Sequence, residues 1–254
     1  MTILSKQNIV ATIDGSQGIN SIAAYIKKNG NHTYAFDVIN VNLSDYVQFY
    51  KELASKLGKI KEAHPVNDKT KKFGISRDIR PIKGLYHYYA SNTRQPLHSD
   101  YAYYPQNKAP NWLMLYCLKP SKYGGLTHLL STKTLREILQ DFNPSLLEKL
   151  YNSVTWFYTG IDGDCIHQRH ILKDDLINWN FWQIKQEYNS PETLKIRDEF
   201  FDFLENVIVA GNIYDFSKKW EIGNAVIFND QKFLHGRDAF LGDRWLKDHA
   251  FFML

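Results

Sequence analysis

The chain has 254 residues and a formal net charge of +4, with 31 Lys and Arg against 27 Asp and Glu. This length predicts one large domain over residues 1–254, and the small charge argues against a nucleic-acid partner. Hydrophobic residues make up 44% and charged residues 23%, which is the balance of a globular protein rather than of a disordered chain. The 15 Phe, 16 Tyr and 6 Trp are enough for a dense core and an aromatic-lined cavity.

Cysteine content and apolar stretches predict the compartment. Two cysteines, Cys117 and Cys165, are too few for a disulfide framework and indicate a reducing environment. Residues 1–15 lack the basic start and long apolar run of a signal peptide, and no segment has the apolar length that spans a bilayer. We therefore expect a cytoplasmic enzyme with no membrane partner.

The N-terminal third predicts a strand, a helix and a basic stretch. Residues 33–40 are rich in aromatic and β-branched residues and predict a strand. Residues 43–57 carry apolar side chains at helical spacing, so a helix follows. Residues 51–83 are rich in Lys and Arg, and we interpret them as a solvated face and loop in preference to an anion-binding surface.

The middle of the chain predicts one buried strand followed by helices. Residues 112–118 are continuously apolar, as expected of a strand that is buried on both faces. Helices are expected at 132–142 and 143–151, the second with Asn143 as cap and Pro144 in its first position. Another helix begins in the same way at Ser190-Pro191.

The C-terminal part returns to strands. Residues 224–229 and 245–252 predict strands, and a turn at 241–243 precedes the second. Strands on both sides of a helical region favour a β-sandwich or barrel core with helical decoration. Residues 165–189 are irregular and rich in Trp and polar residues, and a lid is one interpretation of them.

Two short motifs carry the chemistry. In an extended chain His98 and Asp100 point to the same side, so they can offer a nitrogen and an oxygen to one point. His235 lies far downstream, in Phe233-Leu234-His235-Gly236-Arg237. Two imidazoles and a carboxylate on one face of a metal leave the other face open, which is the ligand set of mononuclear non-haem Fe(II) oxygenases. The alternative for His98 alone is a buried histidine that is hydrogen-bonded to its neighbour.

Four ordered motifs, within residues 92–127 and 223–252, carry a family resemblance. They are the His98-x-Asp100 pair, the Gly124-Gly125-Leu126-Thr127 turn, the run from Asn229 to Arg237, and Asp243-Arg244-Trp245-Leu246. Together these motifs resemble the taurine dioxygenase/clavaminate synthase group of Fe(II)- and 2-oxoglutarate-dependent oxygenases. The resemblance implies a mainly β fold with helical decoration around a double-stranded β-helix core, also called a jelly roll or cupin-like core.

The resemblance also implies a role for each site residue. His98, Asp100 and His235 would hold Fe(II), and 2-oxoglutarate and O2 would occupy the open metal positions. Arg244 would bind the far carboxylate of 2-oxoglutarate with the Thr127 hydroxyl as its companion, since a planar guanidinium can donate two parallel hydrogen bonds to a carboxylate. The alternative for Arg244 is an exposed arginine at a strand end.

Side chains around these motifs have less certain roles. Arg237 is expected to support a loop by hydrogen bonding, and Gly242 to form a tight hairpin that brings Arg244 near His235. His128 is expected on the opposite face of its strand from Thr127. We interpret the segment with His167 and His170 as a surface loop, because it lacks a convincing set of metal ligands.

By the same resemblance, a carboxylate at position 100 favours hydroxylation over halogenation, with desaturation, epoxidation and ring closure left open. Many relatives carry a second arginine four residues beyond the first, where it binds an anionic group of the substrate. Here that position is Asp248, which suggests an amine or guanidine; the alternative is that Asp248 pairs with Lys247 or Arg237. Tyr101 and Asn92 are further candidates for substrate contact.

The expected substrate is therefore a small molecule, an amino acid or an amine-bearing metabolite, that is hydroxylated at an unactivated C–H bond. One alternative is a tailoring oxygenase that acts on an amino acid tethered to an acidic carrier protein. Others are a non-catalytic jelly-roll binding protein and a Zn-dependent hydrolase. Metal content and 2-oxoglutarate binding distinguish these alternatives.

Overall fold

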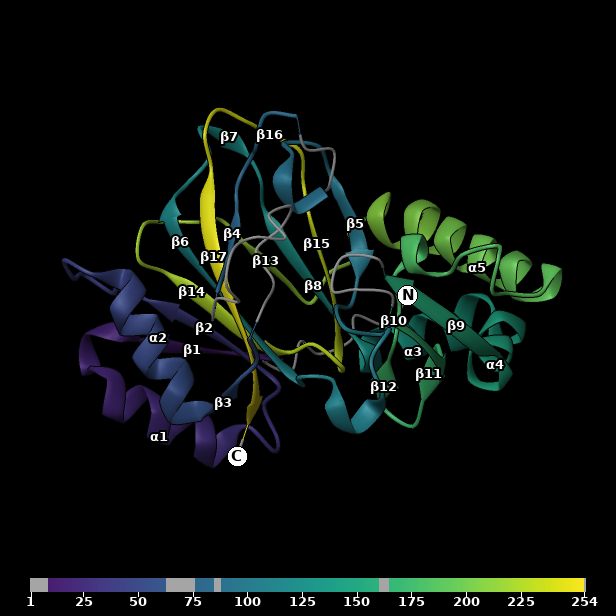
Figure 1. Ribbon diagram of the computed structural model, residues 1–254, viewed down its shortest axis with the longest axis horizontal. Helices are drawn as coiled ribbons and strands as arrows, with labels where there is room; N and C mark the ends of the chain where they lie inside the picture. Colours follow the sequence, from purple (N-terminus) through teal and green to yellow (C-terminus); the bar gives the residue numbers. More distant parts are fainter. Residues whose placement is uncertain (1–8, 63–75, 85–87, 160–164, 254) are drawn as a thin grey trace.

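The computed structural model describes residues 9–62, 76–84, 88–159 and 165–253 (Figure 1). The fold is mainly β with helices on two sides, as expected. The largest sheet has the strand order β1-β2-β14-β6-β17-β3, and β4 also pairs with β17. Its strands are β1 (Val10–Asp14), β2 (Ala35–Ile39), β3 (Gly58–Ile60), β4 (Arg77–Ile79), β6 (Trp112–Lys119), β14 (Ala225–Asn229) and β17 (Trp245–Met253).

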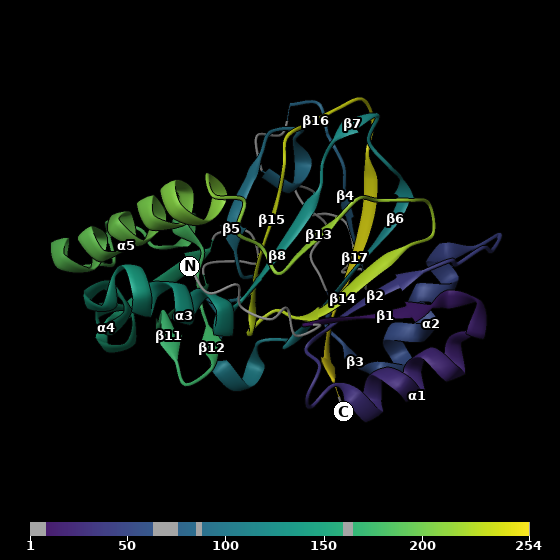
Figure 2. The same ribbon diagram turned by 180° about the vertical axis from the view of Figure 1, so that it is seen from behind.

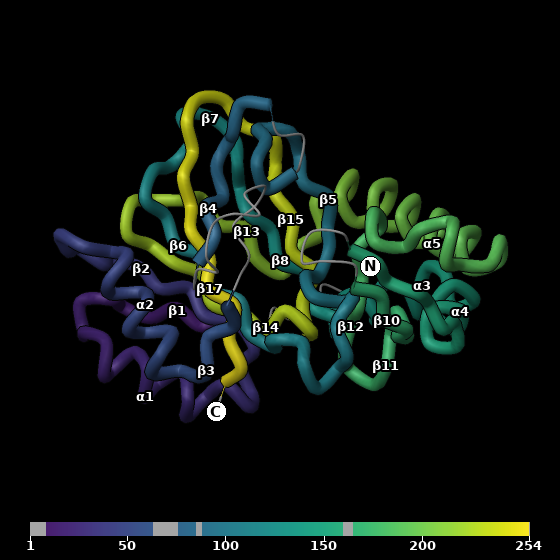
Figure 3. The backbone as a smooth tube through the Cα atoms, viewed as in Figure 1, coloured from purple at the N-terminus to yellow at the C-terminus, as the bar shows by residue number. Residues whose placement is uncertain are grey.

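The second sheet has four strands in the order β13-β8-β15-β5. These strands are β5 (Gln95–His98), β8 (Thr127–Ser131), β13 (Phe216–Lys218) and β15 (Phe233–Arg237). The two sheets bring together segments that are far apart in sequence, and Figure 3 shows β17 running beside β6. One cavity is lined by β5, β8 and β15 from the second sheet and by β4, β6 and β17 from the first, so it lies between the sheets.

Within the described residues five α-helices cover the sheets, and four of them begin at a residue whose side chain caps the first turn. They are α1 (Ile19–Asn29), α2 (Tyr46–Leu57), α3 (Thr132–Phe142), α4 (Pro144–Asn152) and α5 (Pro191–Phe203), and α5 continues as a π-helix over Leu204–Val209. The caps are Asp45, Ser131, Asn143 and Ser190, and each accepts a hydrogen bond from the backbone N–H three residues on. The helices expected at 43–57, 132–142, 143–151 and from Ser190-Pro191 are therefore confirmed.

Strand β6 separates two hydrophobic layers. Leu113, Leu115 and Cys117 point into the inner layer, and Met114 and Tyr116 point into the outer one. This alternation follows from the period of two in a strand and explains why the run is apolar throughout. The strands expected at 33–40, 112–118, 224–229 and 245–252 are likewise confirmed as β2, β6, β14 and β17.

Helices cover each layer from a different part of the chain. Helices α1 and α2 pack on the outer face of the large sheet, with Ile22 and Leu53 fully buried there. Helices α3, α4 and α5 extend the inner layer beside the second sheet, as the view from behind shows (Figure 2). Among the described residues, no helix combines the length and apolarity that crossing a membrane requires.

The described ranges also contain three two-stranded pairs. They are β9 (Val154–Thr159) with β10 (Cys165–His170), β11 (Leu172–Lys173) with β12 (Leu176–Ile177), and β7 (Tyr123–Gly124) with β16 (Phe240–Leu241). His167 and His170 therefore lie in a paired strand, and the prediction of a surface loop was wrong. Cross-strand pairing with residues 154–159 decides this segment, and its polar composition conceals the pairing.

Glycines allow the chain to turn next to the cavity. Gly124 and Gly125 both have positive φ, +67° and +73°. A Cβ on Gly124 would lie 2.3 Å from the carbonyl oxygen of Ala239, so this close approach requires glycine. Gly242, with φ of +83°, ends β16, and the turn expected at 241–243 is confirmed.

Candidate active site

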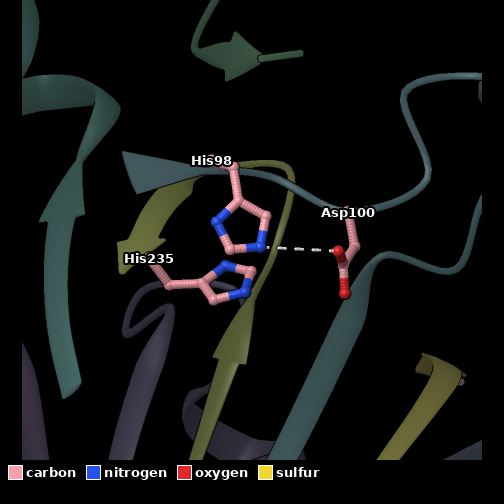
Figure 4. A group of neighbouring side chains, drawn as sticks. All are labelled: His98, Asp100 and His235. Carbon is pink, nitrogen blue, oxygen red and sulfur yellow. Dashed lines mark ion pairs between the residues drawn. The ribbon is translucent and has the colours of Figure 1, made fainter. Parts of the chain in front are cut away.

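Two neighbouring strands bring the metal-ligand candidates together. His98 ends β5 and is directly paired with His235 of β15, so the two imidazole centroids lie 4.1 Å apart. Asp100 follows two residues after His98 and points toward the same space (Figure 4). One ligand atom from each of the three residues lies within 4.8 Å of the others.

Both imidazoles are neutral bases at neutral pH. Burial and the neighbouring His235 lower the pKa of His98 to about 4, and burial also lowers the pKa of His235. The Nδ1 of His98 lies 2.9 Å from the carbonyl oxygen of Pro96, to which a protonated Nδ1 donates. This leaves the Nε2 lone pair to accept a hydrogen bond from the side-chain amide of Gln95 at 3.1 Å, with Oδ1 of Asp100 3.7 Å away. A neutral imidazole with one ring nitrogen so fixed is the form that ligates metals.

Asp100 supplies the negative charge. Burial alone would raise its pKa, but the charge of Arg77, with smaller contributions from the two histidines, holds the pKa below its usual value. The residue that follows, Tyr101, has φ of +58°, so the chain turns sharply away after the carboxylate. Asp100 is therefore an anion on a fixed backbone.

Asp230 connects the two ligand segments and was missed in the sequence. It is 1% exposed, and its Oδ2 accepts a hydrogen bond of 2.8 Å from the backbone N–H of Asp100. Its Oδ1 lies 3.3 Å from Nδ1 of His235. Neither of these two atoms makes a hydrogen bond among the described residues, and burial together with the nearby Asp100 raises the pKa of Asp230, so Asp230 lies behind the His235 ring as a close buried acid. The available signal was an acidic residue within the run from Asn229 to Arg237.

Ser99, between the two ligands, is bound to the segment at 165–189. Its backbone N–H donates to the carbonyl oxygen of Trp179 at 2.6 Å, and the Trp179 N–H donates to the Ser99 hydroxyl at 2.9 Å. The Trp179 side chain is fully buried in the inner layer. The chain around the ligands is thus fixed from outside the sheet.

Arg244 and Thr127 lie together at another part of the same cavity. Nη2 of Arg244 donates to the Thr127 hydroxyl oxygen at 3.3 Å, and Nε1 of Trp220 donates to that oxygen at 2.9 Å. Since the oxygen already accepts two hydrogen bonds, its own proton is directed elsewhere. Thr127 is therefore available as a donor to a ligand, and Trp220 is a partner that the sequence did not reveal.

The Arg244 guanidinium is buried without a counter-ion. It is 2% exposed, so the exposed strand-end alternative is wrong. Its Nε has no hydrogen-bond partner, and no ion pair to it occurs in the part of the chain that the structure describes. Burial, together with the charge of Arg237, lowers its pKa to about 9. A buried, unpaired cation is unfavourable and strongly favours an anionic ligand.

Asp248 reaches the cavity, but with a partner other than those expected. Its carboxylate accepts hydrogen bonds from Arg77, through the backbone N–H at 2.9 Å and through Nε at 2.8 Å. Lys247 pairs instead with Asp78 at 2.7 Å, and Arg237 donates to backbone carbonyls. The alternative of a pair with Lys247 or Arg237 is therefore wrong.

The position of Arg77 also corrects the interpretation of residues 51–83. Arg77 lines the cavity, so this stretch is not only a solvated face. Residues 63–75 of the stretch lie outside the described residues.

The other substrate candidates lie away from the cavity. Tyr101 is buried, with its ring 5.8 Å from the Arg77 guanidinium carbon, and Asn92 is exposed. Neither belongs to the described residues that line the cavity. His128 also lies outside it, as expected, and contacts Ser217 and Asp238.

Arg237 supports a loop, as its sequence context suggests. Its Nη2 donates to the carbonyl oxygens of Tyr88, Ser91 and Thr93 at 2.9, 3.0 and 2.7 Å. The residue is 4% exposed, and burial lowers its pKa to about 10. These bonds attach the segment before β5 to β15.

Arg237→Met is therefore expected to lower the free energy of unfolding by about 2–4 kcal/mol, because the charge-assisted hydrogen bonds of Nη2, whose two protons are shared among three carbonyls, are lost. The measurement is urea denaturation of the metal-free protein. Arg136→Met is the control, since Arg136 makes one exposed bond to the carbonyl of Asp174 and its loss should cost less than about 0.5 kcal/mol. Equal urea midpoints for the two variants would contradict this role.

The depressed pKa of His98 predicts how stability depends on pH. Between pH 6.5, the ordinary pKa of histidine, and about pH 4, the pKa of His98 in the folded protein, the unfolded chain binds a proton that the folded chain does not. The contribution of His98 is therefore fully present above pH 6.5 and is lost as the pH falls toward 4. Urea midpoints of metal-free wild type and His98→Gln at pH 7.5 and 5 test this: the decrease should be larger in the wild type, and equal decreases would refute it.

The donor set fits iron and a dicarboxylic cosubstrate. Two neutral imidazoles and one carboxylate converge, and the unpaired Arg244 guanidinium lies in the same cavity beside the Thr127 hydroxyl. Two histidines and one carboxylate with open positions are typical of non-haem Fe(II) sites. A buried cation that has no acidic partner among the described residues matches the far carboxylate of a 2-oxo acid.

Comparisons with known proteins agree with this geometry. The family model described as "Taurine catabolism dioxygenase TauD, TfdA family" matches residues 39–248. No curated protein sequence matches the chain.

Solved structures with the same fold include an asparagine oxygenase in complex with Fe(II), 3-hydroxyasparagine and succinate. It has 16% identity and a TM-score of 0.63, over 92% of this chain and 79% of that chain. The non-heme iron oxygenase OrfP, in complex with Fe, succinate and (3S)-hydroxy-L-Arg, has 12% identity and a TM-score of 0.62, over 91% and 80%. PvcB from Pseudomonas aeruginosa has 17% identity and a TM-score of 0.63, over 91% and 79%.

The family model spans most of the chain and includes all three metal-ligand candidates. This chain belongs to the taurine catabolism dioxygenase TauD, TfdA family.

Proposed function

We propose that this chain holds Fe(II) through His98, Asp100 and His235 and binds 2-oxoglutarate through Arg244 and Thr127. The observation that carries the proposal is the buried, unpaired guanidinium of Arg244 in the same cavity as the converging triad. When bound, Fe(II), 2-oxoglutarate and O2 supply the oxidant for an unactivated C–H bond, and succinate and CO2 are released. A binding protein without catalysis and a Zn-dependent hydrolase would both leave Arg244 and Thr127 without a purpose.

Within this proposal the residues of the chain orient the reactants and exclude water. Arg244 and Thr127 fix one end of the 2-oxo acid, so that its other end faces the triad. The Pro96 carbonyl holds Nδ1 of His98, and Asp230 lies 3.3 Å from Nδ1 of His235, so the Nε2 atoms are left for the metal position. Burial of both histidines, Arg244 and Thr127 limits water near the reacting centre.

The jelly roll is the finer assignment of the fold that we propose. The cavity between a seven-stranded and a four-stranded sheet supports a double-stranded β-helix. We also propose that residues 1–254 form a single oxygenase domain. The two free cysteines, one of them buried, support a cytoplasmic location.

We propose a small amino acid or amine-bearing metabolite as the substrate, hydroxylated at a C–H bond. Two relatives of the same fold hold hydroxylated amino acids, which supports this class. Asp248 remains the candidate for a charged substrate contact, as a carboxylate already bound to Arg77. An amino acid tethered to a carrier protein is the alternative substrate. In that case free amino acids would not be turned over, whereas carrier-bound amino acids would react.

An anaerobic titration of the apo-protein with Fe(II), then with 2-oxoglutarate, tests the proposal. A visible charge-transfer band that appears only after both additions is expected. Succinate formation on addition of O2 and individual amino acids then identifies the substrate. A folded protein that binds Fe(II) but gives no band would overturn the cosubstrate assignment, and one that binds no Fe(II) would overturn the metal site.

A further inference from the structure

Arg77 lies between two carboxylates of the cavity. Strand β4 pairs with β17 in a register that places Arg77 opposite Asp248. From this position its Nη2 reaches Oδ2 of Asp248 at 2.6 Å and Oδ2 of Asp100 at 3.2 Å. The Arg77 side chain is a quarter exposed, whereas the Asp248 side chain is almost fully buried. One guanidinium thus joins a metal-ligand candidate to a carboxylate of the opposite sheet.

Asp248 fixes the orientation of this guanidinium. Its Oδ2 accepts a hydrogen bond from Nε of Arg77 and lies within ion-pair distance of Nη2, and its Oδ1 accepts a hydrogen bond from the Arg77 backbone N–H. Because the guanidinium is planar and rigid, fixing Nε and the backbone fixes the direction in which Nη2 points. Asp248 also neutralises the arginine, so the positive charge can approach a metal site at a lower electrostatic cost.

The two oxygens of Asp100 have different surroundings. Oδ1 faces the histidines, 3.7 Å from Nε2 of His98, while Oδ2 accepts the hydrogen bond from Arg77. Figure 4 shows one carboxylate oxygen directed at the His98 ring and the other directed away from it. A carboxylate that binds a metal through both oxygens would have to turn Oδ2 toward the metal and give up this bond.

We propose that Arg77, held by Asp248, is a positioning residue that keeps Asp100 a one-oxygen ligand. Oδ1 is left for the metal and Oδ2 is withheld from it. The position that Oδ2 would otherwise take stays open for the cosubstrate chelate or for O2. This inference rests on the proposed function, because it concerns the geometry of the same metal site.

The test uses full-length variants that separate the charge of Arg77, its planar arrangement of N–H donors and its ion pair with Asp248. Arg77→Met removes the charge and the donors, and Arg77→Lys keeps the charge without the planar arrangement of donors. Asp248→Asn keeps the shape of the side chain that holds Arg77 without its charge. Arg80→Met is the matched control, since Arg80 follows β4, stacks on Trp245 and is exposed. The readouts are the visible spectrum of the Co(II)-substituted protein, which reports coordination number, and the 2-oxoglutarate dissociation constant of the Fe(II) form.

Arg77→Met is expected to bind metal, to shift the Co(II) spectrum toward a higher coordination number and to weaken 2-oxoglutarate binding by about 10–100-fold, the range for residues that orient a ligand. Arg77→Lys and Asp248→Asn should give smaller changes in the same direction. Arg80→Met should match the wild type. A purely structural role would lower the melting temperature and leave the Co(II) spectrum unchanged.

A folded Arg77→Met protein with the wild-type Co(II) spectrum and 2-oxoglutarate affinity would overturn the inference. If that variant does not fold, wild-type values in both Arg77→Lys and Asp248→Asn would overturn it equally. The wild-type titration distinguishes a failure of the proposed function from a failure of the role assigned to Arg77. If the wild type shows no charge-transfer band, the proposed function fails. If the wild type and Arg77→Met show the same band, only the role of Arg77 fails.

Discussion

Arg244→Met is expected to raise the dissociation constant of 2-oxoglutarate by about 100-fold or more, because removing one partner of a buried ion pair costs about 3–5 kcal/mol. Methionine preserves the length and apolar packing of the side chain and removes the only cation that contacts the Thr127 hydroxyl among the described residues. Fe(II) binding should be unaffected, because no hydrogen bond or ion pair joins Arg244 to the triad in the described part of the chain. Anaerobic titration followed by the charge-transfer band, with Fe(II) binding measured separately, tests both statements.

Arg197→Met is the control for this experiment. Arg197 lies on α5 and pairs with Asp198, away from the cavity. Its loss should leave the affinity for 2-oxoglutarate within about 2-fold of the wild type, as for a surface pair. If Arg244→Met retained the wild-type affinity, the far carboxylate would have to bind elsewhere and the assignment of Arg244 would be refuted.

His235→Ala is expected to weaken Fe(II) binding by at least about 100-fold, since loss of a direct ligand costs more than the 10–100-fold typical of a residue behind it. The charge-transfer band and succinate formation should disappear with it. The control is His128→Ala on the neighbouring strand β8, which removes another buried histidine of the same sheet.

His128 contacts Ser217 and Asp238 instead of the triad, so its variant should bind Fe(II) with an affinity within about 2-fold of the wild type, whatever its stability. Equal loss of Fe(II) binding in the two variants would show that general damage to the sheet is the cause. Retention of wild-type Fe(II) affinity in His235→Ala would remove this residue from the ligand set.

The secondary structure could be predicted where local signals act alone. Asn143 and Ser190 cap their helices with their own side chains, and the apolar run from Trp112 indicates a strand because both of its faces are buried. The pairing of β9 with β10 could not be predicted in this way. Its strands contain exposed and polar residues, and only the cross-strand register shows the sheet.

The residues of the site likewise include some that could be predicted from the sequence and others that could not. His98, Asp100 and His235 stand in motifs whose chemistry is readable without a fold. Arg77 could not be found, because it lies in a stretch of many basic residues and its partner, Asp248, is 171 residues away. Trp220 was hidden for a related reason, since its hydrogen bond to Thr127 depends on how β13 and β8 are joined.

The hydrogen bonds between Ser99 and Trp179 limit how the site can exchange its contents during turnover. A swing of residues 165–189 away from the sheet would break these bonds or pull on the backbone between His98 and Asp100. It would also expose Trp179, a fully buried side chain, at a cost of about 2–3 kcal/mol for its apolar surface. We therefore expect this segment to act as fixed support for the backbone between His98 and Asp100 rather than as a lid.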